Sequence, residues 1–431
     1  MLSCQPTVFI TVDDRRTGTT GKALDNFPCM RLSGNLRSVP INSNSPNIVL
    51  RWRDALVPSL TPTAELIVGV AVVLGFLHFF VPAIYYEYAK TRWYRKAWTI
   101  TIDESYQPRI SVVIPTYNER EFIEGKLTNI SEEDFPRNLL EVIVVDSAST
   151  DNTAALAEAW ARDNPNLFVR VISESVRRGK LTALLSAFEA LGPLSEVAIV
   201  TDVDVRFQKG TIRKAAKYFA DSSVGIVTAS LAYSSDVPAE SIYRDYYNVL
   251  RVAESRKHST PIHSGVFQAI RTRALRTVGV PVFPGSDDSA FASYMAFAGY
   301  RSIQVEDIAV KEPMRGSQFS TKLRRAQHVI LNFLLTKKYA RSKNVYRRTE
   351  FDTIWTIESW LVLVNPWILM AALLMVAVSL LLGSGEVGII PLVFGSALLL
   401  LKPYRAWMSQ QLYLIMGLLR NLITAKEVWT K

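Results

Sequence analysis

The sequence predicts a doubly wound α/β domain with a mainly parallel sheet, joined to transmembrane and interfacial helices. Between residues 105 and 312, short apolar runs alternate with amphipathic stretches, a rhythm typical of β-α-β units. The composition is the second observation. Hydrophobic residues make up 49% of the chain and charged residues 20%, which is apolar for a water-soluble enzyme and polar for a transporter.

The N-terminal part combines a polar segment with one long apolar stretch. Residues 1–60 show no sustained periodicity and do not begin like a secretory signal, so we expect a flexible tail. Residues 64–86 are apolar all round and long enough to cross a bilayer, which predicts a transmembrane helix. We interpret His78, inside this stretch, as a packed or interfacial side chain rather than a ligand. Trp93 and Trp98 lie among basic residues, as in an interfacial anchor.

The α/β region contains five apolar runs of strand length, each followed by a pattern typical of a helix. Such runs without polar alternation indicate strands buried on both faces of a sheet. Ligands of these sheets bind beyond the carboxyl ends of the strands. The predicted strands are 110–115, 140–146, 167–173, 196–202 and 224–230, and the predicted helices lie near 118–131, 151–163, 178–191 and 209–220.

The C-terminal third contains further apolar and amphipathic segments. Residues 313–350 read as a basic, amphipathic interface helix followed by a linker. Residues 355–402 predict two transmembrane helices, the second one short. Residues 404–424 carry Arg405 and Arg420 too close together to span, which favours an amphipathic helix lying on the membrane.

Basic residues flank these spans unevenly. They are concentrated in 322–348 and absent from the connector 383–386, so the positive-inside rule predicts a cytoplasmic catalytic domain in an integral membrane protein of the cell membrane. Arg51 and Arg53, before the first span, favour the opposite orientation.

The formal net charge of +10 is compatible with nucleic acid, membrane lipids or phosphate-bearing substrates as partners. Zinc-finger spacing and RNA-binding aromatic motifs are missing, so we do not expect nucleic acid. Cys4 and Cys29 both lie in the N-terminal tail, so the core does not depend on disulfides.

Polar residues follow the first predicted strands at the edge where ligands bind. Pro115 to Glu119 follow the first strand and Asp146 to Asp151 the second; either segment reads equally well as a turn with a helix cap. Residues 177–180 place two arginines and Lys180 at a helix start, which suits a phosphate group.

Two further segments supply carboxylates. Asp202 and Asp204 directly follow a buried strand, where two carboxylates can hold a divalent cation and, through it, a diphosphate. An Asp-x-Asp triplet occurs about once by chance in a chain of this length, so its position is the evidence. Asp287 and Asp288 begin an amphipathic helix, either as an N-cap or as a general base for an acceptor hydroxyl.

In this order and spacing, the segments resemble the inverting family 2 glycosyltransferases over residues 108–330. The resemblance implies the GT-A fold, a GDP- or UDP-sugar donor, and Mg²⁺ or Mn²⁺ at Asp202 and Asp204. Asp288 takes the place of the family's catalytic base, and His263-Ser264-Gly265 that of a turn facing the acceptor. The implied substrate-binding residues are Pro115, Tyr117, Glu119, Asp146, Asp151, Lys180, Asp202, Asp287 and Arg324.

Two departures narrow the expected function. The Gln-x-x-Arg-Trp motif of the processive members is replaced by Thr321-Lys322-Leu323-Arg324-Arg325, which makes polymer synthesis doubtful. Arg206 stands where some dolichol-phosphate mannose synthases offer a metal-site side chain, and an arginine cannot be a ligand.

We therefore expect transfer of one hexose, with mannose from GDP-mannose the best guess, to a polyprenyl- or dolichyl-linked glycan at the cytoplasmic membrane face. The alternatives are a polyprenyl-phosphate glycosyltransferase, a processive polysaccharide synthase and a membrane scaffold without activity. Asp202, Asp204 and Asp288 argue against the scaffold.

Overall fold

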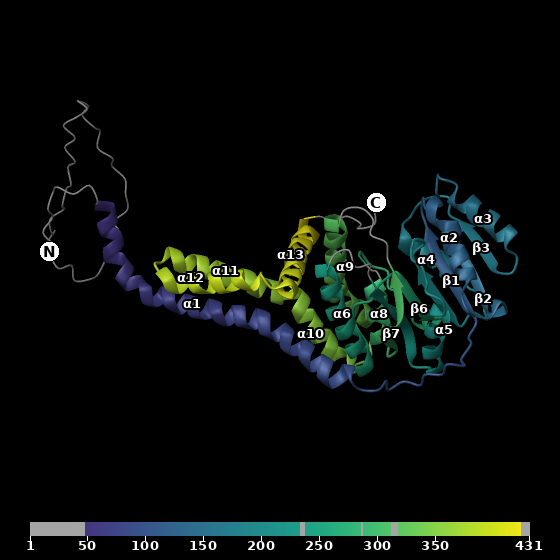
Figure 1. Cartoon of the computed structure of the whole chain (residues 1–431), viewed down its shortest axis with the longest axis horizontal. Helices are drawn as coiled ribbons and strands as arrows, with labels where there is room; N and C mark the ends of the chain where they lie inside the picture. Colours follow the sequence, from purple (N-terminus) through teal and green to yellow (C-terminus); the bar gives the residue numbers. More distant parts are fainter. Residues whose placement is uncertain (1–47, 233–237, 286–287, 312–317, 424–431) are drawn as a thin grey trace, which may run out of the picture. The chain divides into compact units, whose positions relative to one another are not determined.

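The computed structural model describes residues 48–232, 238–285, 288–311 and 318–423 (Figure 1). The chain divides into two units, Met1–Asp54 and Ala55–Lys431, and the second contains the whole sheet domain. Cys4, Cys29, Asp287 and the predicted tail up to residue 47 lie outside the described residues. The first helix begins at Ile48, inside the predicted tail, since extending a formed helix costs little.

A mixed sheet forms the centre of the α/β domain, which confirms the predicted fold class. Its seven described strands have the order β3-β2-β1-β4-β6-β5-β7, and β6 alone runs antiparallel to its neighbours β4 and β5. The strands are β1 Ile110–Thr116, β2 Leu140–Asp146, β3 Phe168–Ser173, β4 Val197–Thr201, β5 Val224–Ala232, β6 Phe267–Arg271 and β7 Arg301–Lys311.

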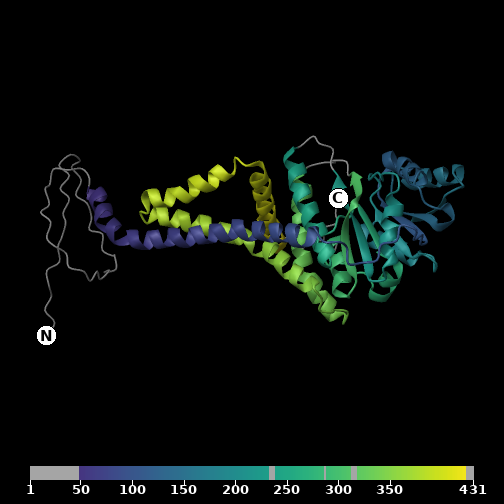
Figure 2. The same cartoon turned by 60° about the horizontal axis from the view of Figure 1, so that its bottom comes forward.

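Helices cover both faces of this sheet, as Figures 1 and 2 show. Successive residues of β1 explain the two layers: Val112 and Ile114 pack on one side, Val113 on the other. The first side is covered by α2 Arg120–Ser131, α3 Thr153–Asp163 and α5 Thr211–Ala216. The second is covered by α4 Lys180–Glu189, α7 Thr272–Val278 and α8 Asp288–Phe297.

Strands β6 and β7 were not predicted. Their sequences, FQAIR and RSIQVEDIAVK, interrupt the apolar run with polar residues. Buried hydrogen bonds explain those residues: Gln268 binds the backbone of Asp288, and Gln304 the side chain of Asn248. Polar residues that are buried with partners look like surface residues in a sequence.

The remaining helices pack beside the sheet domain. They are α6 Pro238–Lys257, α9 Gln318–Ser342, α10 Phe351–Leu363, α11 Asn365–Leu381, α12 Gly385–Leu398 and α13 Lys402–Ile423. The first of the two transmembrane helices predicted within 355–402 is divided into α10 and α11 at Val364. This break lies two residues before Pro366, whose ring cannot continue the hydrogen-bond ladder.

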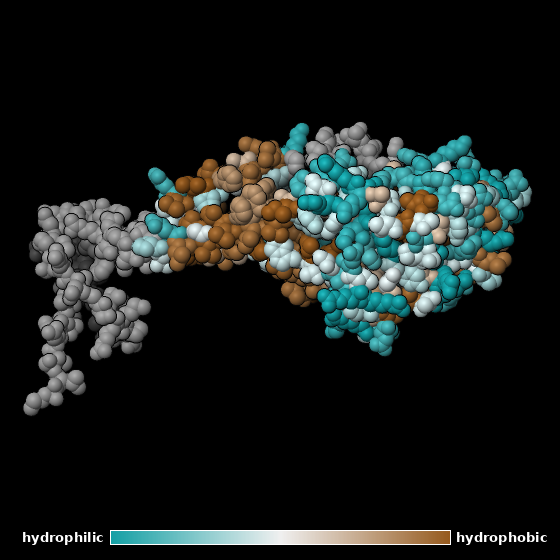
Figure 3. All heavy atoms as spheres, turned by 90° about the horizontal axis from the view of Figure 1, so that it is seen from below, coloured by the Kyte–Doolittle hydropathy of each residue, from teal (hydrophilic) through white to brown (hydrophobic). Residues whose placement is uncertain are grey.

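Two described stretches are long and apolar enough to cross a membrane, Pro62–Tyr94 and Phe351–Leu381, and α12 is a shorter apolar helix. Large apolar side chains on α11 and α12, among them Leu374 and Phe394, point outward, and Figure 3 shows this apolar surface. Contiguous apolar surface of this kind marks contact with lipid or protein.

The first helix, α1 Ile48–Ala89, is held to the C-terminal helices by a buried histidine. The Nδ1 atom of His78 lies 2.9 Å from the backbone oxygen of Asn365, and its ring lies 4.6 Å from that of Trp407. The side chain is 1% exposed, which confirms the prediction that His78 is packed inside.

One buried carboxylate, Glu133, fixes the start of α5 by accepting a 2.9 Å hydrogen bond from the backbone nitrogen of Ile212. Burial raises the pKa of Glu133 to about 7, although this hydrogen bond and Lys126 oppose the rise. Glu133 therefore favours folding most at pH values below its usual pKa of 4.5, and that contribution is lost as the pH rises through about 7.

We predict that Glu133→Gln raises the apparent melting temperature at about pH 8 by a few degrees and leaves it unchanged at about pH 5, because glutamine keeps the acceptor without the buried charge. The control is Glu132→Gln, the exposed neighbour. Equal melting temperatures of Glu133→Gln and wild type at about pH 8 would refute the assignment.

Candidate active site

The carboxyl ends of β1, β2 and β4 meet at one edge of the sheet, because these strands are parallel neighbours. Thr116 at the end of β1 pairs in register with Asp146 at the end of β2, and β4 ends at Thr201 on the other side of β1. The loops after these strands therefore lie side by side, as a ligand site at this edge requires.

Asp146 and Asp151 hold the first two loops together. Asp146 accepts hydrogen bonds from the backbone nitrogen and hydroxyl of Ser149. Asp151 accepts from the backbone nitrogens of Arg120, at 3.0 Å, and Thr153, at 3.1 Å, so one carboxylate caps the starts of both α2 and α3. Their visible role is to shape the loops, which is the cap interpretation that the sequence had left open.

Tyr117 lies against the segment that was predicted to bind phosphate. The guanidinium of Arg177 stacks 3.8 Å from the centre of its ring. Pro115, half-buried, lies in β1 before it, and Glu119 lies at the start of α2. An aromatic face and a cation are thus presented together at the open edge, an arrangement suited to a base and a phosphate.

Lys180 contacts the first aspartate after β4. Its Nζ atom lies 2.7 Å from Oδ1 of Asp202. Burial alone would lower the pKa of Lys180, but the carboxylates of Asp202 and Asp288 outweigh it and raise that pKa, while Arg324 opposes them. The structure thus brings Lys180, Asp202, Asp288 and Arg324 into one electrostatic group, although they come from four separate segments.

A second lysine lies beneath the Asp202–Arg206 loop and was not predicted. Lys126 of α2 is fully buried; its Nζ atom donates to the hydroxyl of Thr201, at 3.0 Å, and to the backbone oxygen of Val205, at 2.7 Å. Burial and the neighbouring Arg206 lower its pKa well below the usual value, and the carboxylates of Asp202 and Asp204 oppose this. The lysine ties the end of β4 to the loop that carries both aspartates.

Arg206 holds the same loop from its other end. Its Nη1 atom donates to the backbone oxygen of Val203 at 3.0 Å. Its guanidinium lies over Gly125 of α2, where an added Cβ atom would be 2.8 Å from Nη2. The arginine thus shapes the loop.

Asp202 and Asp204 suit a divalent cation that a substrate helps to bind. Among the described residues, no three His, Cys, Asp or Glu side chains are grouped as a metal site. Mg²⁺ and Mn²⁺ need fewer protein ligands when phosphate oxygens and water complete the coordination shell. One or two carboxylates suffice at diphosphate sites. The residues present fit such an ion.

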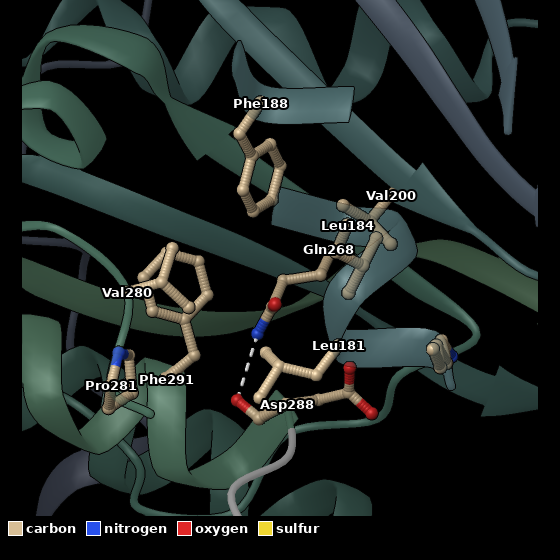
Figure 4. A pocket seen from close by; sticks show the side chains of 10 residues that line it. Leu181, Leu184, Phe188, Val200, Gln268, Val280, Pro281, Asp288 and Phe291 are labelled. Atoms are coloured by element: carbon tan, nitrogen blue, oxygen red, sulfur yellow. Dashed lines mark hydrogen bonds between the residues drawn. The ribbon is translucent and has the colours of Figure 1, made fainter. Parts of the chain in front are cut away.

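Asp288 begins α8 and faces Gly265, which lies in the loop between α6 and β6. A Cβ atom added to Gly265 would lie 1.7 Å from Oδ2 of Asp288, so the backbone of Gly265 touches the carboxylate. The backbone oxygen of Asp288 accepts a 3.1 Å hydrogen bond from Nε2 of Gln268 (Figure 4). The first contact confines the carboxylate, and the second holds the backbone of Asp288 at the start of α8.

An apolar crevice lies beside Asp288. It has a cavity volume of about 30 Å³, close to that of one water molecule, and lies between α4 and α8. Figure 4 shows the Asp288 carboxylate at its edge. Its other lining residues are Lys180, Leu181, Leu184, Phe188, Val200, Gln268, Val280, Pro281 and Phe291.

Residues 258–266, which we call the 258–266 loop, run along the first turns of α8. The hydroxyl of Ser289 lies 3.2 Å from both the backbone nitrogen and the backbone oxygen of His263. Ser293 donates to the backbone oxygen of Pro261 at 2.9 Å. The loop and the start of α8 therefore keep a fixed relation, and with it the position of Asp288.

The ring of His263 is buried, and neither ring nitrogen has a hydrogen-bond partner among the described residues. Burial lowers the pKa of His263 to about 3, so the neutral ring is too weak a proton acceptor to take the place of Asp288 as the base.

Sequence reasoning missed Lys126 and Gln268. Lys126 carried a signal, since it lies on the apolar stripe of α2 with Ile123, Leu127 and Ile130. The sequence contained no signal for Gln268, because strand β6 was not predicted.

The chain is similar to known glycosyltransferases. The model for glycosyl transferase family 2 matches residues 111–279. The solved structure of the mannosyltransferase PcManGT from Pyrobaculum calidifontis, in complex with GDP-Man and Mn²⁺, is 38% identical and has a TM-score of 0.74. The similarity covers 84% of this chain and 100% of that one.

Curated relatives match over shorter regions. The dolichol-phosphate mannosyltransferase of Pyrococcus furiosus is 34% identical over 27% of this chain and 32% of its own length. The poly-β-1,6-N-acetyl-D-glucosamine synthase of Staphylococcus epidermidis is 22% identical over 47% of this chain and 49% of its own. The poly(ribitol-phosphate) β-N-acetylglucosaminyltransferase of Staphylococcus aureus is 31% identical over 26% of this chain. The match spans only 18% of that last relative's length.

We predict that Gly265→Ala destabilises the domain by about 1–3 kcal/mol, because the added methyl group overlaps the Asp288 carboxylate and forces loop and helix apart. Gly192→Ala is the matched control, since an added Cβ atom there meets nothing within 4 Å. Apparent melting temperatures measure both effects, and equal values for the two variants would contradict this contact.

Proposed function

The chain belongs to glycosyl transferase family 2, and we propose that this glycosyltransferase moves one hexose from a nucleotide sugar to an acceptor hydroxyl with inversion at the anomeric carbon. The observation that carries the proposal is the grouping of Asp288, Lys180 and Asp202 at one edge of the sheet. A base, a cation for phosphate and a carboxylate for a metal ion are the groups this reaction needs.

In the proposed reaction, Asp288 accepts the proton of the acceptor hydroxyl. The acceptor oxygen forms a bond to the anomeric carbon while the bond between that carbon and the diphosphate oxygen breaks, and the electron pair leaves with the nucleoside diphosphate. A divalent cation held by Asp202 and Asp204 would offset charge on the diphosphate. Lys180 supplies a second cation there, within contact distance of Asp202.

We propose GDP-mannose as the donor and Mn²⁺ or Mg²⁺ as the cation. The support is the similarity to PcManGT, whose structure holds GDP-Man and Mn²⁺, at 38% identity over the whole of that chain. Pro115, Tyr117 and Glu119 would line the nucleoside pocket, with Asp146 and Asp151 shaping it from behind.

For the acceptor we propose a polyprenyl- or dolichyl-linked glycan at the cytoplasmic membrane face. Two apolar helical stretches and the exposed apolar surface of α11 and α12 support a membrane-bound enzyme. A lipid-linked acceptor is confined to the surface beside which such a domain lies. Arg324 of α9, near Lys180, would contact the diphosphate, and Asp287, outside the described residues, would be a further substrate contact.

The second candidate is transfer to a polyprenyl phosphate, which the similarity to a dolichol-phosphate mannosyltransferase favours. A phosphate acceptor is already ionised and needs no base.

We predict that Asp288→Asn keeps donor binding but lowers turnover about 10²–10⁴-fold, since the acceptor hydroxyl then lacks its base. Transfer from GDP-mannose to a lipid-linked glycan measures this, with Asp163→Asn, an exposed aspartate at the end of α3, as control. Full activity of Asp288→Asn with a polyprenyl phosphate would favour the second candidate, and long products would point to a processive synthase.

We predict that Asp204→Ala abolishes the metal dependence of donor binding, because the loop then keeps only one carboxylate for the ion. Titration with GDP-mannose, with Mn²⁺ and with EDTA, measures this against Asp163→Ala. Mn²⁺ that strengthens donor binding equally in both variants would argue against Asp204 as a ligand.

A further inference from the structure

Two buried glutamates meet where the apolar helices join the sheet domain. Glu254 of α6 is 1% exposed and Glu358 of α10 is 4% exposed, and their carboxyl groups are hydrogen-bonded to each other. Two carboxylates in contact and away from water cannot both be ionised at a tolerable energy, so such a pair retains one proton.

Hydrogen bonds assign the ionised member of the pair. The hydroxyl of Tyr85 donates to Oε1 of Glu254 and that of Thr260 to Oε2, each at 2.6 Å. Both Glu254 oxygens are thus acceptors, which leaves the proton on Glu358. Burial raises the pKa of Glu254, and the bonds from Thr260, Tyr85 and Glu358 oppose that rise.

The other titratable groups that face the pair balance its charge. Arg251, one turn earlier on α6, lies close enough to both carboxyl groups to favour their ionised forms. Tyr246 of α6 lies near Tyr85, and the neutral His263 lies near Arg251. One carboxylate and one guanidinium cancel, whereas loss of the remaining proton would leave an uncompensated buried charge.

The pair is also connected to the catalytic base. Thr260 lies in the 258–266 loop, and its backbone nitrogen donates to the oxygen of Ser302 at 3.0 Å. Five residues further on, Gly265 touches the Asp288 carboxylate. On the other side, Tyr85 and Glu358 belong to the two stretches that are apolar and long enough to cross a membrane.

We propose that Glu254 and Glu358 are positioning residues, a carboxyl pair with one shared proton that fastens the 258–266 loop to α1 and α10 and thereby sets the position of Asp288. The inference rests on the proposed function, because it assumes that Asp288 is the base. The pair touches neither donor nor acceptor. Its effect is therefore on turnover rather than on donor binding.

The test uses the full-length enzyme and three variants. Thr260→Val removes the link between loop and pair with little change of volume, Glu358→Gln replaces the protonated member by a permanent donor, and Glu254→Ala removes the acceptor. Thr277→Val is the control, an exposed threonine whose hydroxyl donates to the backbone oxygen of Arg273. Melting temperature and Mn²⁺-dependent GDP-mannose binding show which variants are folded.

We expect Thr260→Val to lower kcat about tenfold or more while the KM for GDP-mannose stays within about twofold of the wild type, since a small misplacement of a base is costly. Wild-type kcat should also fall as the pH rises and the pair loses its proton. Glu358→Gln has no such proton, so it should keep near-wild-type kcat where the wild-type pair is protonated and lose this fall.

A Thr260→Val enzyme with the kcat of Thr277→Val would overturn the inference, as would a fall of kcat with rising pH that is unchanged in Glu358→Gln. If Glu254→Ala does not fold, the kcat of Thr260→Val still tests the inference. Failure of the proposed function has a different signature: wild type without sugar transfer, or Asp288→Asn with full activity. An inactive Asp288→Asn beside a fully active Thr260→Val would reject only the role of the acid pair.

Discussion

Repulsion between carboxylates is the constraint that the rest of the site is arranged to meet. Asp202, Asp204 and Asp288 converge at one edge of the sheet, and a site of this kind is stable before substrate arrives only if cations lie close by. Lys180 contacts Asp202 directly at 2.7 Å and supplies such a cation. Lys126, whose charged form burial disfavours, contributes hydrogen bonds that hold the loop carrying both aspartates. The positive charge that matters most here therefore lies within the site, whereas the net charge of the whole sequence says little about it.

The sequence was informative where a pattern has one physical meaning. Strands β1, β2, β4 and β5 could be predicted because strands buried on both faces read as continuous apolar runs. The edge strand β3 is only partly buried, and it was predicted from its run of apolar residues alone. Strand β6 could not, since Gln268 and Arg271 are polar residues whose buried partners lie far along the chain. The same limit applies to the site. The positions of Asp202 and Asp288 were apparent from their segments, but the contact between Gly265 and Asp288 depends on how β6 returns to the sheet. Asp151 could be read as a cap or as a ligand, and the cap is what its hydrogen bonds describe.

Buried polar groups also connect the sheet domain with the apolar helices. Tyr85, Glu254 and Glu358 come from three helices, and an apolar cluster of Trp93, Leu250 and Ile354 surrounds them. Apolar contacts alone would allow these helices to slide against one another, because dispersion contacts have little directional preference. Hydrogen bonds of 2.6 Å between defined atoms prevent such sliding. The acid pair thus supplies geometric precision at a junction whose packing energy comes from the apolar side chains.

The contacts of α1 have a consequence for how the protein is made. His78 binds a residue 287 positions later in the chain, and Tyr85 one 169 positions later. At typical synthesis rates of about 5–20 residues per second, the ribosome needs roughly 15–60 s after His78 before its partner exists. During that interval the buried polar side chains of His78 and Tyr85 are without their native hydrogen-bond partners. The contact of His78 can therefore form only after Asn365 has been synthesised, which makes the packing of α1 against the C-terminal helices a late step of assembly.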